Sequence, residues 1–406
     1  MRRPCHSLKR VLGFLSFIAI FASSALAQAQ QTKPSAPYDS IGAAGVTYAG
    51  AGRESSYNLG GPTIHIGVLA PLKGAQKADG EAIVRAAQMA IQDATRHPLP
   101  DGHHLVLSVG DESGPAWGRV TDAVLRLVFK DHAVAIVTSA SGVTAHVSEQ
   151  VGNKIGVPIL TLSTDDTTTQ INMPWIFRLG PSDAQQAQVI ARDIFQVHGF
   201  RHVLLVAERD HDGRMGGREF LAAASKLGFP KPDSLAIDPL RPDPSALLAL
   251  VKSASPQAIV FWTQPENARK LLESTRADGI HTPIYLSLET AQESCGLSFR
   301  MKNTAGVKDP SGAGVYTVDS ASAATPSRQS FARRYQEATG VLPSPVAAEA
   351  YDAVWLVAQA VRAAGPNRAR VRDHISSTQD FAGVSGKISF DSQGNNHTDL
   401  RVVRLQ

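Results

Sequence analysis

Short apolar runs alternate with helix-period stretches along this chain, and one region shows the rule clearly. The run Ala133–Val137 has the composition of a buried strand, and Pro158–Leu162 is a second such run. Between them, apolar residues recur at every fourth position and predict one face of a helix: Val143, Val147, Val151 and Ile155. This strand–helix–strand order favours two parallel strands in one sheet, with the helix covering that sheet.

The same alternation occurs twice along the chain. A first set of strands is predicted over Ile64–Leu69, Leu105–Val109, Ala133–Val137 and Pro158–Leu162. A second set is predicted over Val203–Ala207, Ser234–Ile237, Gln257–Trp262 and Pro283–Leu286. The stretch Pro181-Ser182-Asp183 lies between the sets and is interpreted as a crossing point, where Ser182 or Asp183 caps the next helix. The repeat concerns architecture and not sequence, and it predicts an α/β protein with two similar lobes.

Two polar loops follow neighbouring strands of the first set. One contains Ser139 and Ser141, and the other contains Ser163 and Asp165. The carboxyl ends of parallel strands share one edge of a sheet, and open α/β sheets bind their ligands at that edge. The first loop also leads into a helix N-terminus, whose free N–H groups favour an anionic group. We therefore expect a carboxylate to rest on Ser141 and the amides beside it.

Residues 1–27 have the pattern of a secretory signal peptide. A basic start precedes the apolar run Val11–Ala22, and Ala25-Leu26-Ala27 is a small-x-small cleavage site. Cleavage after Ala27 would release the protein into the periplasm. Residues 28–62 are rich in Ala, Gly, Ser and Gln, and they are predicted to form a flexible leader. Cys295 is the one cysteine left after cleavage, so no internal disulfide is expected.

The charge balance gives no support for nucleic-acid binding. The whole chain has a formal net charge of +4 and a sequence pI of about 9.0. Four positive charges lie in the predicted signal peptide, which contains no acid: Arg2, Arg3, Lys9 and Arg10. The mature chain is therefore close to neutral and lacks the excess of basic charge that a general affinity for nucleic acid requires.

Several motifs along the chain resemble one known family. They are IGVLAPLKG at 66–74, the serine loop followed by GVPIL, then IFRLGPSDAQQA, AEAYDAVWLVAQAV at 348–361 and FAGVSGKISFDSQGN at 381–395. Together they resemble the periplasmic substrate-binding proteins of branched-chain amino acid ABC transporters, the Leu/Ile/Val-binding proteins. The resemblance implies the type I periplasmic-binding fold, with two Rossmann-like lobes around a cleft and a three-crossing hinge. It also implies that lobe 1 comprises 63–182 plus 312–383, and lobe 2 comprises 183–311 plus 384–406.

The resemblance further implies how an amino acid would be held between the lobes. Its carboxylate would be bound by the hydroxyl of Ser141 and by nearby amides. The next loop would contribute Ser163 and Asp165, and Glu289 would bind the ammonium group. Further candidates in the same loop or near strand ends that face the cleft are Ser139, Gln264 and Tyr316.

Three departures from the family pattern place acids where a ring, a hydroxyl or a small residue is usual. They are Asp79 after the first strand, Asp165 in the second polar loop and Asp212 before a glycine of the second lobe. A carboxylate in a pocket must be solvated or paired with a cation. The ligand is therefore expected to be more polar than leucine, with Asp79 and Asp212 contacting its far end, and a cationic far end is one interpretation. Ser141 and the acids also have a simpler interpretation as helix caps or turn residues.

No catalytic or metal motif accompanies this pattern. The sequence has no G-x-S-x-G, P-loop or H-E-x-x-H motif, and its scattered acids lack the spacing of a calcium loop. We therefore expect a monomeric protein without enzymatic activity, cofactor or metal. It would capture a small polar solute, such as an amino acid or a related compound, and deliver it by hinge closure to an ABC permease. The alternative is a receptor that presents its closed form to a membrane sensor.

Overall fold

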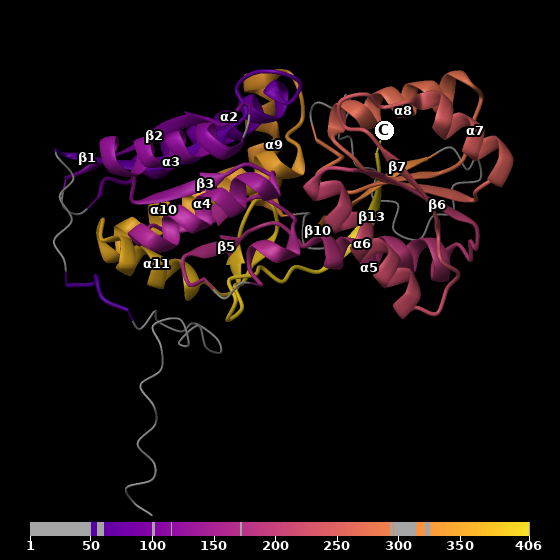
Figure 1. Cartoon of the computed structure of the whole chain (residues 1–406). Helices are drawn as coiled ribbons and strands as arrows, with labels where there is room; N and C mark the ends of the chain where they lie inside the picture. The colour runs from indigo at the N-terminus through magenta and orange to yellow at the C-terminus, as the bar shows by residue number, and fades with distance from the viewer. Residues whose placement is uncertain are drawn as a thin grey trace, which may run out of the picture.

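The computed structural model describes residues 50–54, 61–99, 102–114, 116–170, 173–292, 295, 314–320 and 325–405. These residues form two α/β lobes that lie side by side (Figure 1). The predicted signal peptide and most of the predicted leader lie outside the described residues. No helix in the described part of the chain has both the length and the apolar character needed to cross a membrane.

Lobe 1 is built on a five-stranded parallel sheet with the order β2-β1-β3-β4-β5. Its strands are β1 (Thr63–Ala70), β2 (His104–Asp111), β3 (Ala135–Thr138), β4 (Ile159–Thr161) and β5 (Ile176–Arg178). Its helices are α2 (Lys77–Thr95), α3 (Thr121–Leu125), α4 (Gly142–Ile155), α9 (Pro326–Thr339), α10 (Pro345–Ala364) and α11 (Arg368–Ser376). Wide helical turns flank α3 at Ala116–Val120 and Arg126–Lys130, and a tight helical turn follows β4 at Asp166–Thr168. The strands β11 (Phe381–Ala382) and β12 (Lys387–Ile388) pair as a separate two-stranded sheet.

Lobe 2 is built on a six-stranded sheet with the order β13-β10-β9-β8-β6-β7. Its strands are β6 (Val203–Glu208), β7 (Asp233–Ile237), β8 (Ala258–Trp262), β9 (Ile284–Leu286), β10 (Val315–Ser320) and β13 (Leu400–Leu405), and β13 is antiparallel to β10. Its helices are α5 (Asp183–Arg192), which continues as a wide turn to Val197, α6 (His211–Lys226), α7 (Pro244–Ala254) and α8 (Pro265–Ala277). Helices cover both faces of this sheet (Figure 1).

Local sequence accounts for the start of α5, at the first passage between the lobes. The hydroxyl of Ser182 accepts a hydrogen bond from the Gln185 amide at 3.2 Å, and the Gln185 side chain accepts one from the Ser182 amide at 2.9 Å. This reciprocal pair satisfies two N–H groups that have no partner within the helix. The prediction that Ser182 caps this helix is therefore confirmed.

The other two passages between the lobes lie later in the chain than predicted. Residues 312–383 were expected in lobe 1, but β10 pairs with β9 and β13 in the sheet of lobe 2. Residues 384–406 were expected in lobe 2, but Phe390 belongs to the core of lobe 1, with its ring centroid 5.4 Å from that of Phe177. The chain therefore returns to lobe 1 after Ser320, and it returns to lobe 2 close to Thr398. An apolar period identifies a strand, but it does not identify the sheet that the strand joins.

A short described piece of the predicted leader is docked on lobe 1. The Arg53 guanidinium contacts the Asp373 carboxylate, with Nε and Oδ2 2.5 Å apart. The Asn367 side chain donates to the Gly52 carbonyl at 2.8 Å. Residues 50–54 therefore do not form part of a free linker, which corrects the expected flexible leader over this stretch. The contacts fix the chain on α11 just before the first lobe begins.

Candidate functional site

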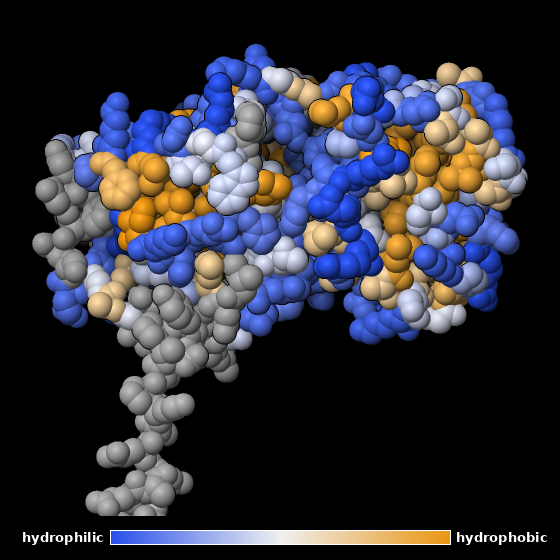
Figure 2. Space-filling view, in the orientation of Figure 1, coloured by the Kyte–Doolittle hydropathy of each residue, from blue (hydrophilic) through white to orange (hydrophobic). Residues whose placement is uncertain are grey.

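Five of the nine predicted site residues line one cavity between the lobes. The cavity has a volume of about 330 Å³, counting space open to solvent. The five are Asp79, Ser139, Ser141, Gln264 and Glu289. They follow the strands β1, β3, β8 and β9, whose carboxyl ends point to the junction of the lobes. In the view of Figure 2, the surface along this junction is mainly hydrophilic, whereas apolar side chains show on both lobes.

The serine loop is ordered by its own hydroxyl groups. The hydroxyl of Ser139 accepts a hydrogen bond from the Ser141 amide at 3.2 Å. Ser141 caps α4, because its hydroxyl accepts from the Thr144 amide at 3.3 Å. The interpretation of Ser141 as a helix cap is therefore confirmed. A hydroxyl that accepts an N–H still has its own hydrogen to donate. The Ser139 hydroxyl bonds the buried Glu112 carboxyl, so Ser141 is the serine that keeps a donor for a ligand.

The first amide of α4 is bound by a carboxylate from lobe 2. The Gly142 N–H donates to Asp212 at 3.3 Å, and Asp212 is buried on α6. Burial, with the negative charges of Asp210 and Asp165 nearby, raises the pKa of Asp212 well above its ordinary value. Asp212 therefore lies at the head of α4 and does not line the cavity, where it was expected to contact the far end of a ligand. The interpretation of Asp212 as a turn residue is wrong, because it is the second residue of α6, and the sequence gave no sign that its side chain reaches the other lobe.

The lobe 2 wall of the cavity carries a buried acid. Glu289 is 8% exposed, and burial, together with the charges of Asp212 and Asp210, raises its pKa well above the ordinary value. The Gln264 side chain donates to the Glu289 carboxylate at 3.3 Å, and the side chain of Gln76 in lobe 1 donates to Gln264 across the cleft. None of the described residues that line the cavity carries a positive charge. The sequence analysis did not single out Gln76 or Gln292, which also line it, because glutamines in loops have no distinctive pattern.

Besides Asp212, three predicted residues lie outside the cavity. Ser163 is buried, and its hydroxyl accepts a hydrogen bond from the Asp165 amide at 3.2 Å. The Asp165 carboxylate is also buried, and it contacts two histidines that the sequence analysis did not select, His146 at 3.2 Å and His211 at 2.7 Å. Tyr316 is in the core of lobe 2, where its ring stacks on that of Tyr285 with the centroids 5.0 Å apart. The structure therefore corrects the expected contacts of these three residues with the cavity.

Asp165 and His146 stabilise each other's charged form. Burial alone would raise the pKa of Asp165, but hydrogen bonds from His146 and His211 lower it below its ordinary value. The carboxylates of Asp165 and Glu149 in turn raise the pKa of His146 to about 10. His146 and Asp165 belong to lobe 1, whereas His211 is the first residue of α6 in lobe 2. This contact is therefore one of the polar links that hold the lobes together.

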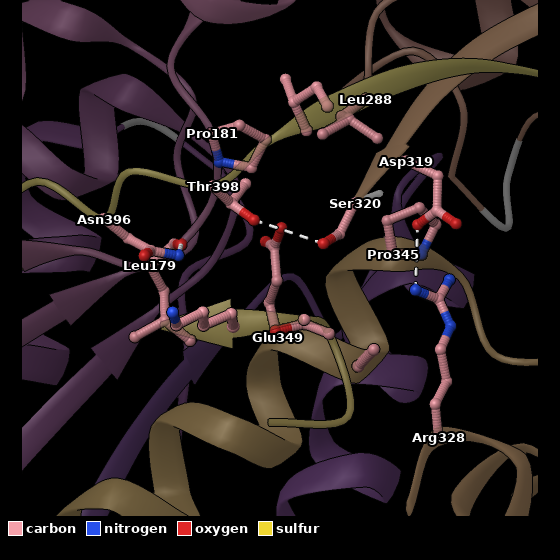
Figure 3. Close-up of a pocket in the computed structure, with 15 residues that line it drawn as sticks. Leu179, Pro181, Leu288, Asp319, Ser320, Arg328, Pro345, Glu349, Asn396 and Thr398 are labelled. Carbon is pink, nitrogen blue, oxygen red and sulfur yellow. Dashed lines mark hydrogen bonds and ion pairs between the residues drawn. The ribbon is translucent and has the colours of Figure 1, made fainter. Parts of the chain in front are cut away.

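A second cavity lies at the hinge, where all three passages between the lobes meet (Figure 3). It has a volume of about 400 Å³, counting space open to solvent. Arg328 of lobe 1 contacts Asp319 of lobe 2 at 2.9 Å, and the hydroxyls of Ser320 and Thr398 lie 3.2 Å apart on two of the passages. Burial, with the charge of Asp352 nearby, raises the pKa of Glu349 to about 8 in this cavity. These contacts tie the hinge strands to lobe 1.

Comparison with known proteins places the chain in a family. Residues 63–406 match the model of the family described as "Periplasmic binding protein". The Leu/Ile/Val-binding protein homolog 3 of Brucella melitensis is 26% identical over 199 residues, which are 49% of this chain and 54% of that protein. Glutamate receptor 3.2 of Arabidopsis thaliana is 23% identical over 249 residues, 59% of this chain and 27% of the receptor. The chain thus spans about half the length, or less, of the curated relatives it matches.

Solved structures show the same fold. The leucine-binding protein LivK of Thermotoga maritima has a TM-score of 0.72 at 20% identity, covering 84% of this chain and 97% of that chain. LivJ of Streptococcus pneumoniae, solved with isoleucine, has a TM-score of 0.70 at 22% identity, covering 84% and 99%. A solute-binding protein of Rhodopseudomonas palustris, solved with benzoate, has a TM-score of 0.72 at 18% identity, covering 85% and 93%.

These matches confirm the resemblance and the fold class that the sequence predicted, and they agree with a binding protein and not an enzyme. The chain belongs to the periplasmic binding protein family and has the type I periplasmic-binding fold.

Proposed function

We propose that this protein binds a small solute with an ammonium group, such as an amino acid, in the cavity between the lobes. The observation that carries the proposal is the position of Glu289, a buried carboxylate on a cavity wall whose described lining residues include no cation. An unpaired buried charge is costly, and a ligand cation offsets that cost. The ammonium group would therefore lie against Glu289.

The opposite wall suits a carboxylate. Ser141 keeps a hydroxyl hydrogen to donate, and it lies at the start of α4. The Gly142 amide already binds Asp212, and the Ser139 hydroxyl bonds Glu112, so the Ser141 hydroxyl carries most of this recognition. Asp79 is a second acid on the lobe 1 side of the same cavity. A polar amino acid matches these groups better than leucine does, because few apolar side chains line the cavity.

The experiment that tests binding is a thermal-shift screen of the mature protein. Its panel contains polar, basic, acidic and aliphatic amino acids, simple amines and simple carboxylates. A ligand at 100 times its Kd stabilises the folded protein by about 2.7 kcal/mol, which corresponds to a shift of roughly 5–10 °C for lobes of this size. We expect polar amino acids to give the shift and Glu289→Gln to reduce it by about half or more. A shift with leucine alone, or with a carboxylate that lacks an amine, would contradict the proposal.

Transport is the function that family membership favours for such a binding event. We propose that a signal peptide ending at Ala27 exports the chain, that hinge closure traps the solute, and that the closed form docks on an ABC permease. The family match and the Leu/Ile/Val-binding relatives support this proposal. Loss of uptake of the labelled solute in cells lacking this protein would agree with it, and unchanged uptake would contradict it.

A receptor role is the second candidate. The similarity to plant glutamate receptors favours it, although it covers only a small part of those proteins. In this case the closed form would be presented to a membrane sensor. The same uptake experiment separates the two functions, because a receptor that binds the solute would leave its uptake intact.

A further inference from the structure

Three side chains from the two lobes bring metal-ligating atoms together outside the solute cavity. They are His146 on α4, Asp165 after β4 and His211 at the start of α6, and their ligand atoms all lie within 4.8 Å of one another. Nε2 of His146 is 3.2 Å from Oδ2 of Asp165, and Nε2 of His211 is 2.7 Å from the same oxygen. The two imidazole rings meet edge to face, with an interplanar angle of 88°.

The distances from the two imidazole nitrogens to Oδ2 of Asp165 are close to those of a metal site. Donors held about 2.0–2.2 Å from a tetrahedral zinc ion lie about 3.3–3.6 Å from one another. The contact between His146 and Asp165 already has nearly this length, and the contact between His211 and Asp165 needs to open by about half an ångström. The side chains of both histidines are about one-quarter exposed, at 25% and 29%, so an ion and a bound water can reach them.

Neighbouring groups orient the two lobe 1 ligands. The Glu149 carboxylate lies 2.9 Å from Nδ1 of His146, so it favours a proton on Nδ1, and Nε2 becomes the ligand atom when the ion displaces its proton. Glu149 is itself almost completely buried. The amide and hydroxyl of Thr167 hold Oδ1 of Asp165 at 2.9 and 2.8 Å. The Thr167 hydroxyl also lies 2.9 Å from Nε2 of His146 and must turn fully towards Asp165 when that nitrogen binds an ion. A carboxylate behind a ligating histidine is a common arrangement in protein metal sites.

We propose that His146, Asp165 and His211 form a binding site for a zinc-like transition-metal ion that bridges the two lobes. Two imidazole nitrogens and one carboxylate suit Zn²⁺ and its neighbours, whereas Ca²⁺ and Mg²⁺ prefer a shell made of oxygens. Three protein ligands leave a fourth position for water. Because one ligand comes from lobe 2, the ion binds the closed arrangement more tightly than the open one. By linkage, it then favours closure.

The site also adjoins the wall of the solute cavity. A Cβ atom placed on Gly142 would lie 3.0 Å from the Asp165 carboxylate, so the head of α4 separates the proposed ion from the serine loop. An ion here can strengthen solute binding without touching the solute, because both events favour the same closed state. The proposed ion site does not depend on the identity of the solute, and it can be tested without one.

The test is calorimetric titration of untagged, metal-free protein with ZnCl₂, and with CaCl₂ as a second ion. We expect one Zn²⁺ ion per chain and no saturable heat with Ca²⁺. His211→Ala and His146→Ala should weaken the Zn²⁺ affinity by more than about 100-fold, and Glu149→Gln by about 10- to 100-fold. His202→Ala is the matched control, because His202 is exposed on lobe 2 and is not part of the cluster, and it should bind like wild type.

A second readout separates ligation from a structural role. Co²⁺ in the site should give the intense visible absorption of a tetrahedral complex, and His211→Asn should lose it while keeping its circular dichroism spectrum. The proposal is overturned if wild type shows no saturable Zn²⁺ binding. It is also overturned if His211→Ala and His211→Asn bind the ion as tightly as wild type, because a bridging site requires the lobe 2 ligand.

Discussion

The contact between Gly142 and Asp212 joins the two lobes outside the cavity. A substitution at Gly142 can therefore destabilise the proposed closed state without changing a cavity residue. A Cβ atom on Gly142 would lie 2.4 Å from the Asp212 carboxylate, whereas ordinary Cβ contacts begin at 3.4 Å, so Asp212 must move by about 1 Å. Asp212 is 6% exposed, so little room is available for this movement. We therefore predict that Gly142→Ala breaks the hydrogen bond between the Gly142 amide and Asp212 and forces the lobes apart.

The expected loss follows from that one bond. An ordinary hydrogen bond contributes about 0.5–1.5 kcal/mol, which corresponds to about a 2- to 13-fold weaker solute affinity if the proposed closed state alone holds the solute on both sides. Isothermal titration calorimetry with the solute found in the screen measures this affinity. The free protein should keep its melting temperature, because alanine fits a helix start whose φ angle is not positive.

A double-mutant cycle provides the control. Once Asp212→Ala has removed the carboxylate, Gly142→Ala should have a much smaller further effect on affinity, because only the 3.0 Å contact of its Cβ with the Asp165 carboxylate remains. Solute affinity within about twofold of wild type in the single Gly142→Ala variant would refute this reasoning. It would mean that Asp212 rotates away at little cost and that the contact does not support closure.

Three further predictions concern charge and packing. Solute affinity should rise as pH is raised above the ordinary pKa of a glutamate, because free Glu289 has a raised pKa and must ionise to bind an ammonium group. Glu289→Gln should remove this slope in calorimetry. Gly216→Ala should destabilise lobe 2 by about 1–3 kcal/mol in urea unfolding, since its Cβ would lie 1.8 Å from Trp262. Burial raises the pKa of Asp93, but the hydrogen bonds from Arg334 and Tyr351 lower it further, so the pKa is below its ordinary value. Arg334→Met should therefore reduce the stability of the fold at pH 7, where Asp93 is ionised. It should have no such effect at a pH below the lowered pKa, where Asp93 is protonated.

The sequence predicted those features that depend on local pattern. The strand before Ser139, the helix after it and the cap at Ser182 are each decided within a few residues, and all three occur in the structure. The carboxyl-end loops also came together as the sheet geometry required, with Ser141 and Glu289 lining one cavity.

Contacts between the lobes were beyond sequence reasoning. The carboxylate of Asp165 meets His211, 46 residues away along the chain, and Asp212 reaches Gly142 over a separation of 70 residues. Neither pair has a spacing that marks it, because the partners come from separate lobes. The sheet that β10 joins was misassigned because its pairing is also distant in sequence: β10 and β13 join residues 80–90 positions apart.

Calorimetry with a matched pair of solutes tests the central claim most directly. The pair is the amino acid that gives the largest thermal shift and its analogue without the amino group, each titrated into wild type and Glu289→Gln. The account predicts tight binding of the amino acid to wild type alone, with the analogue and the variant each weaker by about 10-fold or more, since each lacks one half of a charge-assisted hydrogen bond. Equal affinity of wild type for both solutes, unchanged by Glu289→Gln, would contradict it.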